Sequence, residues 1–307
     1  MDSWHRPLLV RAAGLTGVLC ISFAAIFVRA AGTSPATTTV FRLLYALPVL
    51  FALWLAVRRR DRRDRAARGL AVAAGLLLAA DLTFWHYTIE FIGAGLATVL
   101  VNTQVVFVGL AAWIAFRERP TRTALWVVPA MLGGVALISG LGRSDAYGED
   151  PLAGVLAGVT AGAFYASYIM LLRTSNRRFL APSAGPMFDA TLGAALGGVL
   201  VAAAGIGDFT AGPSWPAHGW LVVLALVVQV AGWMLITVAL PRLPALETSA
   251  MILLQPVGAL AWGRIFFDET LSGVQAAGVV VVLAGLALLS LRGTVEPHPA
   301  RPVARNR

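Results

Sequence analysis

Several ionisable side chains lie inside long apolar stretches of this chain, where they could bind ligands or carry protons. Asp81 lies near the middle of the stretch 69–91, and Trp85 and Thr88 follow on the same helical face. A carboxylate at such a depth in lipid is costly and usually functional. Asp81 therefore predicts a site that binds a cationic group or carries a coupling proton. The alternative is a structural hydrogen bond to a neighbouring helix.

A second polar pair lies on the same stretch. His86 and Glu90 are four residues apart and lie about 140° around the helix from the face of Asp81. Arg42, in the stretch 36–57, is expected at the same depth as His86. Two interpretations stay open: a structural Arg42–Glu90 ion pair, or an Arg42 that forms an external gate or binds a substrate carboxylate.

Two glutamines form the third candidate pair. Gln104 and Gln255 would flank a substrate if both face the same axis, and otherwise they bond between helices. Asn102 lies about 200° from Gln104 on a regular helix and is expected to face elsewhere. Pro256 lacks a backbone donor, so it predicts a kink near the middle of its helix.

The composition limits the class of protein. The chain has 307 residues, of which 58% are hydrophobic and 13% charged, whereas soluble domains carry about 25% charged residues. Its net charge of +9 comes from arginines between apolar stretches, so nucleic-acid binding is not expected. The single cysteine, Cys20, and the scattered histidines give no metal-binding spacing. We expect no metal, no cofactor and no catalytic residue.

The elements that would position these residues are transmembrane helices. Apolar runs such as 69–80 do not alternate, which excludes a β-barrel. The first run is long for a signal peptide, so a retained helix is expected. We predict an all-α integral membrane fold with ten spans. They lie near 8–28, 36–57, 69–91, 94–116, 122–141, 151–172, 186–206, 218–240, 245–267 and 272–291.

Charge between the spans predicts the orientation. The segment 58–68 carries seven arginines, and the positive-inside rule assigns it to the cytoplasm. The acidic segment 143–150 is then external. Both termini are cytoplasmic, and the tail 292–307, rich in proline and arginine, is expected to be disordered. The predicted location is the cell membrane.

An internal repeat divides the chain. A shift of 151 residues aligns 94–139 with 245–290. The informative matches are polar residues and glycines: Gln104 with Gln255, Glu118 with Glu269, Gly134 with Gly285, and Ser139 with Ser290. The halves are 8–141 and 151–291, each with five helices, so they enter the membrane with opposite orientations. Such inverted repeats exchange inward-open and outward-open states, and Glu118 and Glu269 are expected to be structural helix caps.

Two segments carry a family resemblance. The stretch FWHYTIEFIGAGLATVLVNTQVVFVGLAAWIAFRERPT at 84–121 resembles the EamA-type drug/metabolite transporter superfamily, and so does 255–285. Arg42 resembles the arginine typical of the family's second helix. The resemblance implies ten helices in two EamA repeats and export of metabolites, amino acids or drugs. Val105 departs from the pattern where the second repeat has Pro256, so the first-repeat helix is expected to be straighter.

These observations favour a secondary transporter, an exporter working by alternating access and driven by a gradient. The alternatives are an intramembrane enzyme, a lipid-linked flippase or a membrane scaffold. The expected partners are a small-molecule substrate and the lipid bilayer. The ladder Gly154, Gly158 and Gly162 predicts close helix packing within the chain, with a homodimer as the alternative.

Overall fold

The structure is a computed structural model. It describes residues 7–116, 120–139, 146–176, 183–205, 207–239, 242–243 and 245–292. The elements formed by these residues are all helical. Glu118 and the tail after Arg292 lie outside the described residues, so the expectations for them stay predictions.

The first half begins with a span made of two helices in line. Its elements are α1 (Pro7–Ser22), α2 (Ala24–Ala31), α3 (Pro35–Val57), the 3-10 turn η2 (Arg58–Arg60), α4 (Arg65–Val101), α5 (Gln104–Phe116) and α6 (Arg122–Ile138). Polar residues begin several of these helices: the side chains of Ser34, Asp64 and Thr121 each accept a hydrogen bond from a backbone amide three residues later.

The second half contains a span with an unusual centre. Its elements are α7 (Pro151–Asn176), α8 (Ala184–Ala203), α9 (Ala217–Val223), the π-helix η3 (Leu224–Gly232), α10 (Trp233–Ala239), α11 (Ala245–Phe267) and α12 (Gly273–Arg292). The helices α9, η3 and α10 follow one another directly, so they make a single span that is π-helical in the middle.

The ten predicted spans correspond to described helices, and the predicted membrane fold is confirmed. Within the part of the chain that the structure describes, seven helical stretches are long and apolar enough to cross a membrane. One of them, Arg65–Ala111, contains 47 residues and covers the two predicted spans 69–91 and 94–116. The two remaining predicted spans are the shorter apolar helices Arg122–Ile138 and Met251–Phe267. Hydropathy alone therefore located every span to within a few residues.

A sharp turn inside α4 separates the third and fourth spans. Gly93 has φ 81° and ψ 174°, a conformation that is essentially restricted to glycine. The backbone amides of Ala94 and Gly95, which start the fourth span, donate to the carboxylate of Glu269 at 2.7 and 3.0 Å. Glu269 thus caps a helix in the other half of the chain, and not the helix that follows it.

The fourth span is broken in its middle, contrary to the sequence-based expectation of a straighter helix. Thr103 donates its amide to the carbonyl of Leu100, and Val106 donates to Thr103, so α-helical bonding stops between α4 and α5. The counterpart α11 continues through Pro256 as one helix. The absence of proline at Val105 therefore does not keep this span straight. The kink predicted at Pro256 stays a prediction.

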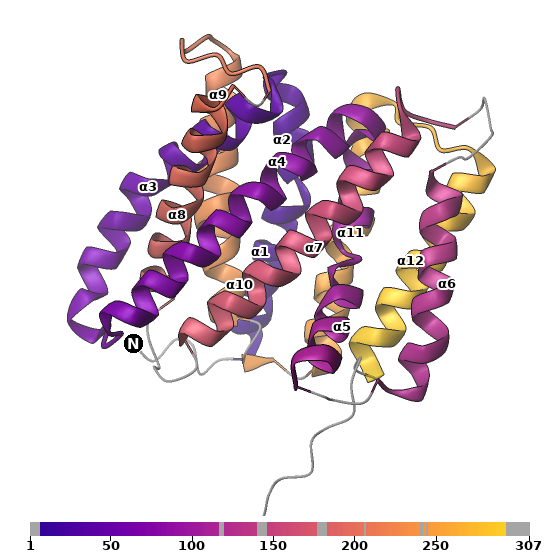
Figure 1. Ribbon diagram of the computed structural model, residues 1–307, viewed down its shortest axis with the longest axis horizontal. Coiled ribbons are helices and arrows are strands. Elements are labelled where there is room, and N and C mark those ends of the chain that lie inside the picture. Colours follow the sequence, from indigo (N-terminus) through magenta and orange to yellow (C-terminus); the bar gives the residue numbers. More distant parts are fainter. Residues whose placement is uncertain are drawn as a thin grey trace, which may run out of the picture.

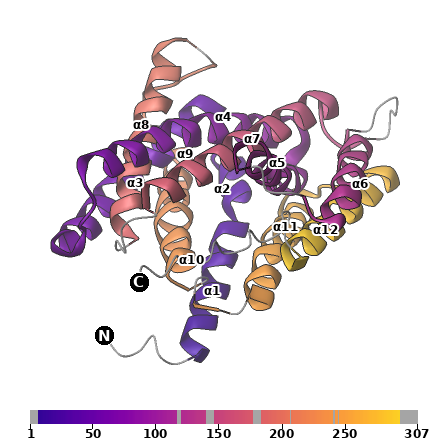
Figure 2. The ribbon, with the colours of Figure 1, turned by 60° about the horizontal axis from the view of Figure 1, so that its bottom comes forward.

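Helices of the first half pack against their equivalents in the second half. The helices α6 and α12 pack together at one end of the molecule, and α3 and α8 pack together at the other (Figures 1 and 2). Both are pairs of equivalent helices, because α6 and α12 are fifth and α3 and α8 are second in their halves. An axis that exchanges the halves would produce such pairs.

The two faces of the bundle differ in their loops (Figure 1). We call the upper face in Figure 1 the acidic-loop face; it contains 32–34, 146–150, 207–216 and 268–272. We call the opposite face, which contains 58–64, the arginine-loop face.

The glycine ladder is used within the chain. A Cβ atom at Gly154 would lie 2.5 Å from Ile92, and one at Gly158 would lie 2.9 Å from Leu100. A Cβ atom at Gly162 would lie 3.1 Å from Thr103. The ladder therefore lets α7 approach the third and fourth spans closely, as predicted for packing within the chain.

Candidate functional site

A central cavity of about 230 Å³ lies between the halves. Five of the six residues singled out in the sequence line it: Arg42, Asp81, Trp85, Gln104 and Gln255. They come from α3, α4, α5 and α11, so both halves contribute. Asp81, Gln104 and Gln255 each lie near the middle of their apolar stretches 69–91, 94–116 and 245–267, which places the cavity near the midplane of the bundle.

Arg42 and Asp81 bring opposite charges into this cavity. Their residues are only 3% and 4% exposed. The Oδ1 atom of Asp81 and the Nη1 atom of Arg42 have no hydrogen-bond partner, and the two residues form no ion pair within the described part of the chain. The Arg42 guanidinium lies 5.8 Å from the centre of the Trp85 ring. Unpartnered charges at such depth are costly, so a ligand that pairs with them would be stabilised.

The amides of the fourth span converge on the same cavity. The Oε1 atom of Gln104 is buried and has no partner. Asn102 also lines the cavity, although it was expected to face elsewhere. That expectation assumed a regular helix of about 100° per residue, and the break at Asn102–Thr103 removes the regularity. Asn102 itself donates to the carbonyl of Thr98 at 2.7 Å.

Sequence reasoning missed Gln229, which lies in the π-helix η3 and lines the cavity. Its Oε1 accepts a hydrogen bond from Nε of Arg42 at 3.3 Å, and its Nε2 donates to Thr191 at 3.5 Å. Long π-helices are rare and often mark functional sites. The signal in the sequence was the same as for Gln104, an amide in the middle of an apolar span.

Two tyrosines were missed as well. Tyr165 and Tyr168 lie three residues apart on α7, so they share a helical face, and both line the cavity. Their rings lie 5.9 Å apart, and Tyr165 packs edge-on against Trp233 at 6.2 Å. The spacing in the sequence was visible, but it is also common in ordinary helix packing.

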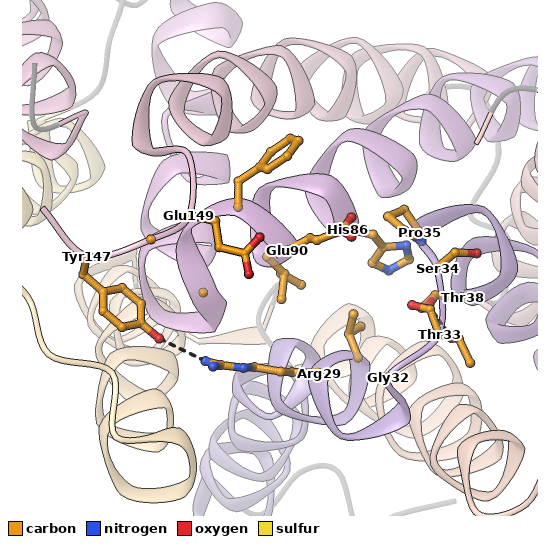
Figure 3. A pocket seen from close by; sticks show the side chains of 15 residues that line it. Arg29, Gly32, Thr33, Ser34, Pro35, Thr38, His86, Glu90, Tyr147 and Glu149 are labelled. Carbon is orange, nitrogen blue, oxygen red and sulfur yellow. Dashed lines mark hydrogen bonds between the residues drawn. The ribbon is translucent and has the colours of Figure 1, made fainter. Parts of the chain in front are cut away.

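His86 lies in a different cavity from the other predicted residues. A vestibule of about 700 Å³ on the acidic-loop face is lined by His86 and Glu90, together with Arg29, Tyr147 and Glu149 (Figure 3). The rings of His86 and its neighbour Trp85 lie 5.4 Å apart. Because Trp85 lines the central cavity and His86 lines the vestibule, these adjacent residues separate the two spaces.

The structure does not contain the expected Arg42–Glu90 ion pair. Arg42 is buried and contacts Gln229 and Trp85, whereas Glu90 is exposed at the vestibule. The two residues line different cavities, because Trp85 and His86 separate those spaces. The Arg42 guanidinium therefore keeps a free nitrogen toward the central cavity.

Ion pairs join the halves at both faces. At the arginine-loop face, Arg63 bonds to Asp61 and to Asp189 of the second half, each at 2.8 Å, and Arg68 bonds to Asp189 at 2.9 Å. At the acidic-loop face, Arg29 bonds to Glu269 at 2.5 Å. Burial raises the pKa of Asp61, but the hydrogen bonds from Arg63 outweigh that effect and hold the pKa below its ordinary value.

The described residues offer no metal centre. Among them, no three histidine, cysteine or acidic side chains gather closely enough to hold a metal ion.

Comparison with known proteins agrees with this architecture. Residues 10–140 and 152–291 each match the EamA-like transporter family. The chain is 28% identical over 264 residues to the threonine/homoserine exporter RhtA of Salmonella typhimurium, covering 85% of this chain and 83% of RhtA. It is 23% identical to the uncharacterized transporter YcbK of Bacillus subtilis, covering 91% and 92%. A solved crystal structure superimposes with a TM-score of 0.60 at 17% identity, over 92% of this chain and 96% of the other.

Proposed function

The chain belongs to the EamA-like transporter family, and we propose that it exports a small zwitterionic metabolite of the amino-acid type through its central cavity. Family membership makes it a membrane transporter and not an enzyme. What is proposed is the class of substrate, the direction of transport, the mechanism and the residues that bind.

The observation that carries the proposal is the pair of opposite, unpartnered charges in one small cavity. A zwitterion presents an ammonium group to Asp81 and a carboxylate to Arg42, and it removes both unpaired charges at once. Drug-sized ligands occupy pockets of about 300–1,000 Å³. The central cavity, at about 230 Å³, favours a smaller metabolite.

The relatives support the same class of substrate. RhtA is named an exporter of threonine and homoserine, which are both small zwitterions with a hydroxyl group. Gln104 and Gln255 flank the cavity from the two halves and offer amide groups for such a hydroxyl. The identity of 28% supports the class and leaves the individual amino acid open.

Coupling to a gradient follows from the chemistry of Asp81. A carboxylate that binds either a proton or the substrate ammonium, but not both, exchanges one for the other across the membrane. The equivalent helices of the two halves pack against each other, which supports an alternating-access motion between them. A proton gradient directed inward would then drive the metabolite outward.

The orientation is proposed from charge. The arginine-loop face carries seven arginines in 58–68 and is assigned to the cytoplasm of the cell membrane. The vestibule then opens on the external side. Both termini are cytoplasmic, because ten spans return the chain to its starting side.

The test is threonine flux in liposomes that contain the purified full-length protein under an imposed pH gradient. Asp81→Asn keeps the size of the side chain but cannot carry the proton. We expect it to lower proton-coupled flux at least about 100-fold, a loss of about 2.7 kcal/mol in transition-state stabilisation. Coupled flux unchanged in Asp81→Asn overturns the role of Asp81.

A matched control separates this effect from a general loss of charge. Asp208 lies in a loop of the acidic-loop face and lines neither the cavity nor the vestibule. Asp208→Asn is expected to leave flux within about two-fold of the wild type, since exposed charges contribute little. Arg42→Gln should weaken binding of threonine more than binding of its methyl ester, which has no carboxylate.

A further inference from the structure

The vestibule lies beyond the central cavity on the path to the acidic-loop face. Trp85 lines the central cavity and His86 lines the vestibule, and their rings are 5.4 Å apart. A substrate that leaves the cavity toward this face therefore enters the vestibule next. Charged and polar side chains line the vestibule, and they are not among the residues that line the central cavity.

Two glutamates line the vestibule, Glu90 from α4 and Glu149 from the loop before α7. The amide of Glu149 donates to the carbonyl of Phe91 at 2.8 Å, so the loop is held against the residue that follows Glu90. Both glutamates line the vestibule and are exposed. Figure 3 shows Glu149, Glu90 and His86 along one side, with Arg29 opposite.

His86 supplies a third acceptor. Its residue is only 2% exposed, and its Nε2 atom is buried without a partner. Its Nδ1 atom lies 2.8 Å from Oγ1 of Thr39, which donates its own hydroxyl hydrogen to the carbonyl of Pro35. The hydrogen between the ring and Thr39 therefore belongs to Nδ1, and Nε2 of the neutral ring is a bare acceptor.

Arg29 faces these acceptors with a donor. It bonds through Nη1 to Glu269 and, at 3.3 Å, to the hydroxyl of Tyr147. Its Nε and Nη2 atoms make no hydrogen bond within the described part of the chain, its guanidinium lies 4.4 Å from the centre of the Phe267 ring, and its side chain is 34% exposed. The vestibule thus offers three acceptors on one side and a guanidinium nitrogen on the other.

We propose that the vestibule is a second binding site for the exported zwitterion, with Glu90, Glu149 and His86 accepting from its ammonium group and Arg29 donating to its carboxylate. A primary ammonium has three N–H donors, which matches three acceptors. The inference rests on the proposed function for its ligand. The site holds the substrate after it passes Trp85 and before it leaves the protein.

The experiment measures protection of a cysteine in the vestibule of the full-length protein. Cys20 is the only native cysteine, so Cys20→Ala gives a background without thiols. Thr33→Cys then places one thiol on the vestibule wall, and a membrane-impermeant thiol reagent modifies it in intact cells. L-threonine is expected to slow modification at least about five-fold, whereas N-acetyl-threonine, which has no ammonium group, is expected to have little effect. Equal protection by both compounds, or by neither, overturns the proposal.

Variants then locate the protection. Glu90→Gln combined with Glu149→Gln should raise the threonine concentration that gives half protection at least about ten-fold, while Asp208→Asn leaves it unchanged. Asp81→Asn should preserve protection although it abolishes coupled flux, so failure of the vestibule site and failure of the proposed function give different results. Protection that disappears with Asp81→Asn, or survives the double glutamate variant, overturns the inference. If Thr33→Cys does not fold, Phe91→Cys, which also places a thiol in the vestibule lining, replaces it.

Discussion

The ion pairs that join the two halves differ between the two faces in their exposure to water. At the arginine-loop face, the side chains of Arg63 and Asp189 are 0% and 2% exposed. At the acidic-loop face, the Arg29 side chain is 34% exposed, although its partner Glu269 is only 4% exposed. Breaking a desolvated pair leaves a buried charge unpaired, whereas water compensates an exposed one. The Arg63–Asp189 pair is therefore the most deeply buried of the described ion pairs between the halves, although Arg68 and the Arg11–Glu247 pair on the same face are partly exposed.

The comparison bears directly on alternating access. The acidic-loop face already contains a vestibule of about 700 Å³, while the buried Arg63–Asp189 pair at the other face connects the halves across their boundary. For the proposed motion to open the arginine-loop face, Arg63 and Arg68 must separate from Asp189.

The largest expected effect comes from Arg63→Ala. It leaves Asp61 buried without its main partner and leaves Asp189 with Arg68 alone, which costs about 3–5 kcal/mol in the free energy of unfolding. Denaturant titration in detergent measures this change. A matched control is Arg264→Gln, because Arg264 and Asp268 are 58% and 94% exposed and their pair contributes about 0–1 kcal/mol. Equal losses in the two variants would show that burial does not distinguish the pairs.

A smaller effect is expected at the acidic-loop face. Glu269→Gln removes the charge that accepts from Ala94 and Gly95 and pairs with Arg29. The expected cost is about 2 kcal/mol, since hydrogen bonds to a charged group each contribute about 1.5–3 kcal/mol and the amide keeps one oxygen. Arg29→Gln should cost only about 0.5–1 kcal/mol, because water screens the exposed arginine. The same denaturant titration compares the two, and a larger loss in Arg29→Gln would contradict the assignment of Glu269 as a helix cap.

The smallest effect concerns pH. The pKa of Asp61 lies below its ordinary value of 3.8, so its ionised form is stabilised in the folded protein. This stabilisation is complete above pH 3.8 and is lost as the pH falls through the lower folded-state pKa. Melting temperature measured against pH should therefore drop at the acidic end. Asp61→Asn should reduce that drop, and an identical pH profile in the variant would exclude Asp61 as its source.

The sequence predicted the membrane fold well because hydropathy determines the length and number of spans. It also separated the third and fourth spans at 91–94, where the structure has the turn at Gly93. It did not predict the break at Asn102–Thr103 or the π-helix η3. Both features change the direction of side chains within an apolar run. Both depend on how the helices pack together, so the pattern of apolar residues along the chain does not predict them.

Part of the candidate site was predictable because its residues are polar groups within apolar stretches. Asp81, Arg42 and Gln104 stand out because polar groups in lipid are expensive. The same rule would have found Gln229. The placement of His86 in a separate space was not predictable, because whether adjacent residues line one cavity or two depends on the rings of Trp85 and His86 that lie between them.

The cap supplied by Glu269 has a consequence for biosynthesis. The amides of Ala94 and Gly95 bond to a residue that follows them by 175 and 174 positions in the chain. At about 5–20 residues per second, the ribosome needs roughly 10–35 s to add that length. During this interval the fourth span inserts into the membrane with those two donors uncapped. The first half therefore reaches its final structure only after the ninth span has emerged. Folding of the first half is completed by a residue of the second half that is synthesised later.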